Sequence, residues 1–139
     1  MKVLLYYVGK PRDRNANALA DEFIQRSSRY ARCEMREVQP ARFDPWEKHP
    51  SATKILLDPA GKAMDSGQFA NLIGRAEEEA RDLVFLVGGA SGLPAAWREN
   101  GGILLSLTAM TLPHELARVV LAEQIYRAFT TLRGHPYPK

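Results

Sequence analysis

Residues 83–93 read Leu-Val-Phe-Leu-Val-Gly-Gly-Ala-Ser-Gly-Leu. The first five form a continuous apolar run bounded by Asp82 and Gly88, which is typical of a central strand buried on both faces of a parallel sheet. Glycines in the loop that follows let the backbone approach a ligand and leave its amide groups free to bind it. The same loop also fits a simple tight turn, and the residues alone leave both interpretations open.

The rest of the chain alternates between strand patterns and helical spacing. Strands are predicted at Lys2–Val8, Arg32–Val38, Lys54–Asp58, Leu83–Val87 and Ile103–Leu107. Helices are predicted from Asn15 to Arg29, from a cap at Ser66 to about Arg81, and from His114 to Leu132. This alternation predicts an α/β fold with a mostly parallel sheet and helices on both faces. No internal repeat or linker interrupts it, so residues 1–139 are expected to form a single domain.

Proline and glycine mark the expected breaks between these elements. The sequence Pro59-Ala60-Gly61 is expected to end the strand at 54–58. Between residues 39 and 53, Pro40, Pro45 and Pro50 predict an ordered but irregular connection.

The composition excludes several classes of protein. Of the 139 residues, 45% are hydrophobic and 25% are charged, which is close to the average for globular domains. The longest apolar runs fall far short of the ~20 residues that cross a bilayer, and the N-terminus has no secretory signal pattern. A cytoplasmic protein without a membrane partner is therefore expected. Cys33 is the single cysteine, so an internal disulfide is excluded.

The net charge is +3, a modest excess that is compatible with an anionic partner. Basic residues gather in two clusters, one after the first strand and one in the tail. These clusters are Lys10, Arg12 and Arg14, and Arg133, His135 and Lys139. Contact with phosphate and ordinary solvated surface are both open interpretations of each cluster.

Residues 106–114 read Ser-Leu-Thr-Ala-Met-Thr-Leu-Pro-His and join the last strand to the last helix without an acidic residue, lysine or arginine. Backbone donors and acceptors beside small apolar side chains suit an adenine edge in a neutral cleft. A buried crossover, with Thr111 as helix cap and Pro113 in the first turn, explains the residues equally well. Arg118, one turn further on, fits an ordinary pair with Glu115.

The titratable residues give little support for hydrolysis. His49, His114 and His135 show no metal-ligand spacing, and neither a Ser-His-Asp arrangement nor a carboxylate pair stands out. No metal is therefore expected. A reaction whose leaving group is already activated on a cofactor needs mainly positioning from the protein, which contributes ~7–11 kcal/mol.

Four motifs together resemble a known family. They are Leu86–Gly89 with Gly92-Leu93, the uncharged loop at 106–114, Glu123–Ala128, and the ending His135–Tyr137. In this order they are similar to the RlmH family of SPOUT-class methyltransferases. Those enzymes transfer a methyl group from S-adenosylmethionine to N3 of a pseudouridine in large-subunit (23S) ribosomal RNA. The resemblance implies a C-terminal trefoil knot and a homodimer whose interface helps to build the active site.

The resemblance also implies the site residues. Those expected to contact S-adenosylmethionine are Leu57, Gly88, Leu107, Thr108, Ala109, Met110, Thr111 and Leu112. Those expected on the target side are His114, Arg118, Arg133, His135 and Tyr137. A histidine or tyrosine relay would take the N3 proton as the methyl group arrives. The implied partner is large-subunit ribosomal RNA, within the ribosome, and not DNA.

The tail departs from the family pattern. Pro138 follows Tyr137, where family members commonly carry a histidine and then a basic residue. The alternative function is therefore a ribosome-associated RNA-binding protein that keeps the fold and the cofactor pocket with weakened catalysis. A generic nucleotide-binding module is disfavoured because the phosphate-binding motifs are missing.

Overall fold

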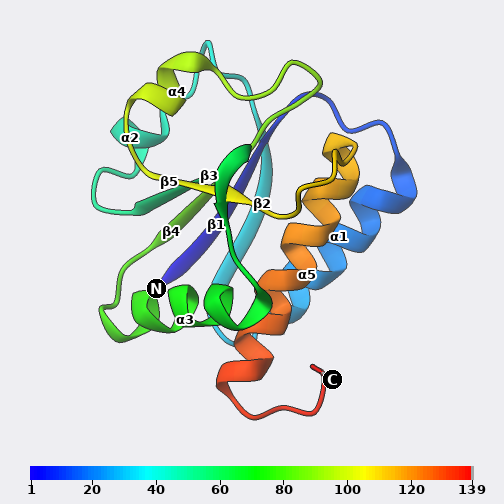
Figure 1. Ribbon diagram of the computed structural model, residues 1–139, viewed down its shortest axis with the longest axis vertical. Helices are drawn as coiled ribbons and strands as arrows, with labels where there is room; N and C mark the ends of the chain where they lie inside the picture. The colour runs from blue at the N-terminus through cyan, green and yellow to red at the C-terminus, as the bar shows by residue number, and fades with distance from the viewer. Residues whose placement is uncertain (139) are drawn as a thin grey trace.

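A parallel sheet forms the middle of the molecule (Figure 1). The computed structural model describes residues 1–138. The strands are β1 (Lys2–Val8), β2 (Arg32–Val38), β3 (Thr53–Ala63), β4 (Leu83–Val87) and β5 (Ile103–Ser106). Their order is β2-β1-β4-β3-β5, and every neighbouring pair is parallel. The predicted α/β fold is therefore confirmed.

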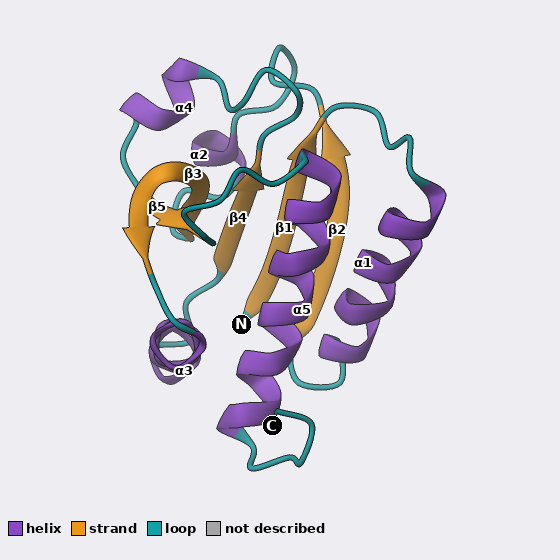
Figure 2. Cartoon of the chain, turned by 45° about the vertical axis from the view of Figure 1, so that its right-hand side comes forward, coloured by secondary structure: helices purple, strands orange, loops and turns teal. Residues whose placement is uncertain are grey.

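Helices cover both faces of the sheet, as expected (Figure 2). They are α1 (Arg14–Ser27), α2 (Pro45–Lys48), α3 (Ser66–Glu78), α4 (Ala95–Glu99) and α5 (His114–Leu132). The side chains of α1, α3 and α5 pack on one face, and Trp46 of α2 and Trp97 of α4 pack on the other. None of these helices is long and apolar enough to span a membrane, for the part of the chain described.

Alternation along β1 divides the core between the two faces. Val3, Leu5 and Tyr7 join the cluster under α1, α3 and α5, whereas Leu4 and Tyr6 join the cluster under α2 and α4. Successive side chains of a strand point to opposite faces, so both layers are tied to this one strand. All five residues of β4 are buried, which confirms the central strand predicted from the apolar run.

Strand β3 is longer than predicted. Its register against β5 shifts between Leu57 and Lys62, and pairing then resumes as far as Ala63. The sequence Pro59-Ala60-Gly61 therefore forms an irregularity inside the strand and does not end it. A Cβ on Gly61 would lie 2.5 Å from the carbonyl carbon of Leu104, so only glycine fits where the curved strand crosses β5.

Helix boundaries also differ from the prediction. Asp65, and not Ser66, caps α3, and it forms a reciprocal capping box with Gln68. The helix ends at Glu78, before the expected end at Arg81. The short helices α2 and α4 were not predicted, because one turn of helix leaves no periodic pattern in the sequence.

Helix α5 runs away from the carboxyl ends of the strands. Its first residue, His114, lies near the irregular part of β3 and the loops that follow β4 and β5. Its last turn leads into the tail at the opposite end of the helix (Figure 1). Its 19 residues span about 28 Å, at ~1.5 Å per residue. The two ends of this helix are therefore separate places on the molecule.

Candidate functional site

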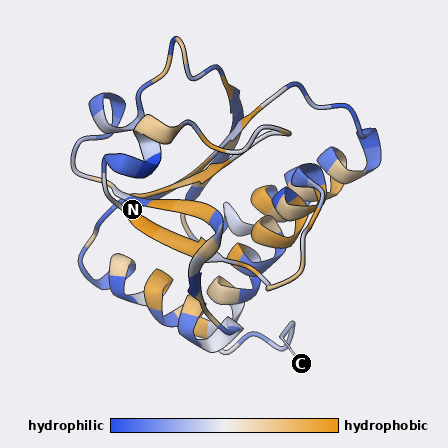
Figure 3. Cartoon of the chain, turned by 45° about the horizontal axis from the view of Figure 1, so that its top comes forward, coloured by the Kyte–Doolittle hydropathy of each residue, from blue (hydrophilic) through white to orange (hydrophobic). Residues whose placement is uncertain are grey.

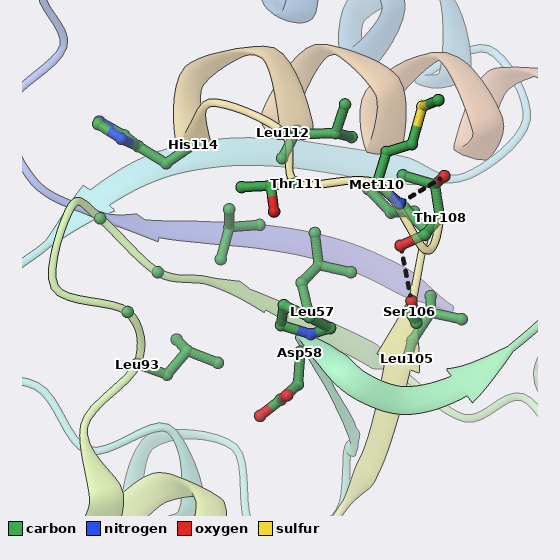
Figure 4. Close-up of a pocket in the computed structure, with 17 residues that line it drawn as sticks. Leu57, Asp58, Leu93, Leu105, Ser106, Thr108, Met110, Thr111, Leu112 and His114 are labelled. Carbon is green, nitrogen blue, oxygen red and sulfur yellow. Dashed lines mark hydrogen bonds between the residues drawn. The ribbon is translucent and has the colours of Figure 1, made fainter.

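Three segments at the carboxyl edge of the sheet line a single cavity (Figure 4). They are the irregular part of β3 and the loops that follow β4 and β5, and the start of α5 closes the cavity. The empty space between these walls, open mouth included, is about 660 Å³. Of the eight residues predicted for the cofactor, those lining it are Leu57, Gly88, Leu107, Thr108, Met110, Thr111 and Leu112. Ala109 is exposed and does not line it.

The glycine loop after β4 is both a tight turn and a wall of the cavity. Gly92 donates its backbone N–H to the carbonyl oxygen of Gly89 at 2.9 Å. A Cβ on Gly88 would lie 2.6 Å from the carbonyl carbon of Gly92 and 2.8 Å from the nitrogen of Leu93. Any side chain at position 88 would push this turn apart, which explains the glycine. The two interpretations of the loop therefore describe one structure.

The loop after β5 is held by its own side chains. The Ser106 hydroxyl donates to the carbonyl oxygen of Thr108 at 3.0 Å, and the Met110 N–H donates to the Thr108 hydroxyl at 3.2 Å. Thr111 does not cap α5. Pro113 occupies the cap position without a side-chain hydrogen bond. The threonines therefore remain part of the cavity wall, and Met110 stays 76% exposed.

Among the described residues that line the cavity, one carries a carboxylate. Asp58 accepts an N–H from Ala60 at 2.8 Å and pairs with Arg98 of α4 at 2.5 Å. Figure 4 shows its carboxylate pointing away from Thr111 and Leu112. The pair neutralises Asp58 and attaches α4 to the irregular part of β3. Arg98 was not predicted, because no pattern in the sequence connects it to residue 58.

His114 lies in the cavity wall at the start of α5, half-buried. Arg118, one turn further, does not reach the cavity and is only 1% exposed. Its guanidinium lies 3.6 Å from the centre of the Tyr7 ring and hydrogen bonds to Asn17 through Nη1. Nε and Nη2 are buried and have no hydrogen-bond partner among residues 1–138. Burial lowers the pKa of this guanidinium.

Glu115 ties the loop between β1 and α1 to the start of α5. Its Oε2 accepts the backbone N–H groups of Asp13 at 3.0 Å and Arg12 at 3.1 Å, and the side-chain amide of Asn17 at 2.5 Å. Arg118 lies 4.0 Å away, so the predicted pair with Glu115 is present within a larger network. The two backbone hydrogen bonds are the main reason that the pKa of Glu115 falls to about 2.

The predicted tail residues lie at the other end of α5. Arg133 donates to both carboxylate oxygens of Glu77, at 2.5 and 3.0 Å, and is thereby neutralised. His135 is exposed, and Lys139 lies outside the described residues. Neither Arg133 nor His135 lines the cavity of its own chain.

Tyr137 folds back onto α5. Its hydroxyl donates to Glu123 at 2.8 Å, and its ring lies 4.7 Å from that of Tyr126. Glu123 also pairs with Arg127, one turn further along α5, at 2.8 Å. Burial, together with the hydrogen bond to Glu123, raises the pKa of the Tyr137 phenol. The phenol therefore stays protonated at neutral pH while it is docked here.

Comparison with known proteins shows which class of protein has this parallel sheet with a cavity at its carboxyl edge. Residues 1–138 match the family described as "Predicted SPOUT methyltransferase". A probable methyltransferase from Bordetella pertussis Tohama I has a similar fold, with a TM-score of 0.62 and 17% identity, over 91% of this chain and 93% of that chain. The SpoU methyltransferase AviRb from Streptomyces viridochromogenes, in complex with the cofactor AdoMet, has a TM-score of 0.54 and 14% identity, over 94% and 61%.

Relatives found by sequence show which family of SPOUT methyltransferases the chain resembles. Ribosomal RNA large subunit methyltransferase H from Solibacter usitatus is 62% identical over 137 residues, 99% of each chain. The protein of the same name from Sorangium cellulosum is 39% identical over 143 residues, again 99% of each. The chain belongs to the family of ribosomal RNA large subunit methyltransferase H. The resemblance seen in the four motifs is therefore confirmed.

Replacing Glu115 by glutamine should lower the free energy of unfolding at pH 7 and flatten its dependence on pH. The folded-state pKa is about 2 and the ordinary value is 4.5. Its stabilisation is therefore present above pH 4.5 and lost as the pH falls toward 2. Urea unfolding at a series of pH values measures this. Glu78→Gln, at an exposed position on α3, is the control, and identical acid profiles for both variants would contradict the prediction.

Proposed function

We propose that the chain transfers a methyl group from S-adenosylmethionine to N3 of a pseudouridine in large-subunit ribosomal RNA, in the cytoplasm. The observation that carries this proposal is the cavity in which the three segments meet that the resemblance implies for the cofactor. Full-length relatives named as large-subunit rRNA methyltransferases support it. We further propose that the segment from β5 into α5 forms the trefoil knot of the family.

The cavity fits the cofactor in chemistry as well as in position. Its walls combine apolar side chains with exposed backbone groups of the loop at 107–112, which suits a flat adenine ring. Because Gly88 has no side chain, the turn stays closed and a ligand can approach its backbone. When bound, S-adenosylmethionine supplies an activated methyl group. The chain's own task is then to hold the nucleobase in line and to accept a proton.

His114 is the proposed contact to the nucleobase from this chain. It lies in the cavity wall, whereas Arg118 is sealed beneath it and acts as a positioning residue for the start of α5. An imidazole accepts protons near neutral pH, and the docked Tyr137 phenol does not. The proton acceptor is therefore proposed to be a histidine, either His114 or His135.

The tail reaches a cavity only in a homodimer, on this proposal. Helix α5 spans about 28 Å from His114 to Leu132, at ~1.5 Å for each of its 19 residues, and residues 135–137 beyond it do not line the cavity of their own chain. Leu116 and Val120 are 48% and 37% exposed and lie four residues apart, so they form one apolar stripe on α5. A second copy seated there with its α5 antiparallel would cover the stripe and bring its tail to this cavity. An isologous interface would repeat the arrangement twice.

Replacing Gly88 by leucine should abolish binding of S-adenosylmethionine without unfolding the protein. The Cβ alone would lie 2.6 Å from the backbone of Gly92, so the turn must open and deform the cavity wall. Calorimetric titration of the folded variant with cofactor measures the effect. The control is Gly67→Leu at the start of α3, where a Cβ meets nothing closer than 3.4 Å. Unchanged affinity in Gly88→Leu would place the cofactor elsewhere.

Mixed dimers should recover activity that neither parent variant has. One chain carries Gly88→Leu, and the other ends after Arg133. A mixed dimer keeps one intact cavity, on the shortened chain, and one intact tail, on the other chain. Purification with two different tags isolates the mixed dimer. With one working site of two, it should show about half of the wild-type methyl transfer. If each tail serves its own chain, the mixed dimer stays inactive.

Ribosomes should accept the methyl group only when the target pseudouridine has been made. Pseudouridine carries an additional ring N–H, and a site that pairs with it disfavours uridine by ~1–3 kcal/mol, because a buried acceptor is then left unpaired. Tritiated methyl uptake is compared between ribosomes from a normal strain and from a strain unable to make pseudouridine at that position. Equal uptake would refute the pseudouridine assignment. Binding without any uptake would favour the alternative RNA-binding function.

A further inference from the structure

We propose that residues 9–14, the loop after β1 together with the first residue of α1, bind the phosphate backbone of the acceptor RNA through Lys10, Arg12 and Arg14. We call this segment the basic loop. The proposal deepens the proposed function, on which it rests, by naming where the RNA backbone is held. The sequence left the role of this cluster open, and the structure supplies three arguments.

The three cations of the basic loop are free to contact phosphate. Lys10, Arg12 and Arg14 are all exposed, and none of them forms an ion pair within the part of the chain that the structure describes. The tail cluster differs, because Arg133 is already paired with Glu77. Among the described arginines and lysines of the two clusters, those of the basic loop are the unpaired ones.

The carboxylates next to the basic loop do not pair with its cations. Asp13 accepts the N–H of Ala16 at 3.0 Å and caps α1. Glu115 accepts the backbone N–H groups of Arg12 and Asp13 and the amide of Asn17, and its ion pair is with the buried Arg118. Both carboxylates are therefore engaged with groups other than the side chains of Lys10, Arg12 and Arg14. They fix the course of the loop and leave its cationic side chains directed to solvent.

The basic loop lies beside the cavity. The basic loop begins at Gly9, where a Cβ would lie 3.8 Å from the Cα of Gly89 in the glycine loop. Its other end is bound to Glu115, the neighbour of the cavity residue His114. Both ends are thus fixed to walls of the cavity, and Figure 3 shows the segment as a hydrophilic strip leading into α1. An RNA strand whose base enters the cavity would pass its phosphates over this strip.

The chemistry of these residues fits phosphate. Lysine and arginine neutralise phosphates and release counterions, which makes binding depend on salt with a slope of about −0.7 per contact for single strands. The chain's net charge is only +3, so general attraction to RNA is weak. Three unpaired cations on one fixed loop therefore supply a large share of the local positive field.

The test compares two variants that lose the same charge. One carries Lys10→Ala, Arg12→Ala and Arg14→Ala. The control carries Lys2→Ala, Arg29→Ala and Arg75→Ala, at exposed positions without ion pairs and away from the cavity. For each protein, KM for ribosomal particles and kcat are measured by methyl uptake at several salt concentrations. Calorimetry gives the affinity for S-adenosylmethionine.

Removal of the three positive charges of the basic loop should raise KM for ribosomal particles. It should leave kcat and the affinity for the cofactor close to wild type. The slope of log KM against log salt should fall by about 2, which corresponds to roughly 20-fold less salt sensitivity between about 50 and about 200 mM. The control variant should keep the wild-type slope. A variant with Lys10→Arg, Arg12→Lys and Arg14→Lys should bind as the wild type does.

Equal changes in the two alanine variants would overturn the proposal, because the effect would then come from net charge. An unchanged KM in the basic-loop variant would overturn it as well. Absence of methyl uptake by the wild type is a different result, since it contradicts the proposed function. In that case sedimentation of each protein with ribosomal particles still decides whether the basic loop holds RNA.

Discussion

The carboxyl edge of the sheet depends on backbone segments that approach one another more closely than a Cβ allows. At Gly61 a Cβ would lie 2.5 Å from Leu104, at Gly88 2.6 Å from Gly92, and at Gly89 2.7 Å from the carbonyl oxygen of Val8. These three contacts join β3 to β5, close the glycine loop, and seat that loop against the end of β1. Because each contact is between backbones, it cannot be relieved by a rotamer change. The shape of the cavity is therefore set by the backbone of the sheet and of its loops.

Helix α5 converts this edge into a functional arrangement. Its first turn contributes His114 to the cavity and Glu115 to the loop after β1, and the tail beyond its last turn docks on Glu123 through Tyr137. Leu121, Ile125 and Phe129 fix the helix to the core, so its two ends cannot move independently. The docked tail does not line the cavity of its own chain, which is the geometric reason for a site shared between two copies on our proposal.

Much of this could be predicted from the sequence, because the signals are local. The apolar run of β4, the spacing of α5 and the uncharged loop at 106–114 each point to their own structure, and the three segments expected at the cofactor do meet in one cavity. The continuation of β3 past Pro59-Ala60-Gly61 could not be predicted, because β5 supplies the pairing from 43 residues further along the chain. Such pairing overrides a local turn signal.

The least predictable features are charged side chains whose environment is set by the tertiary structure. Arg118 resembles a surface residue in the sequence, yet it is 1% exposed under the first turn of α5. Arg98 has no motif, yet it neutralises Asp58 at the cavity. Position along a helix gives the direction of a side chain but not what covers it. The burial of Arg118 and the pairing of Arg98 follow only from how α1, α4 and α5 are placed.

The distribution of charge at this edge follows from these placements. The cavity lining is neutral, because its one carboxylate is paired with Arg98 and points away from Thr111 and Leu112. The free cations lie outside it, on the basic loop, and are held there by carboxylates that bind backbone amides. A positively charged cofactor would be repelled by cations inside the cavity, whereas RNA phosphates need them at the rim. Separation of the two fields thus lets one edge of a small sheet serve both ligands.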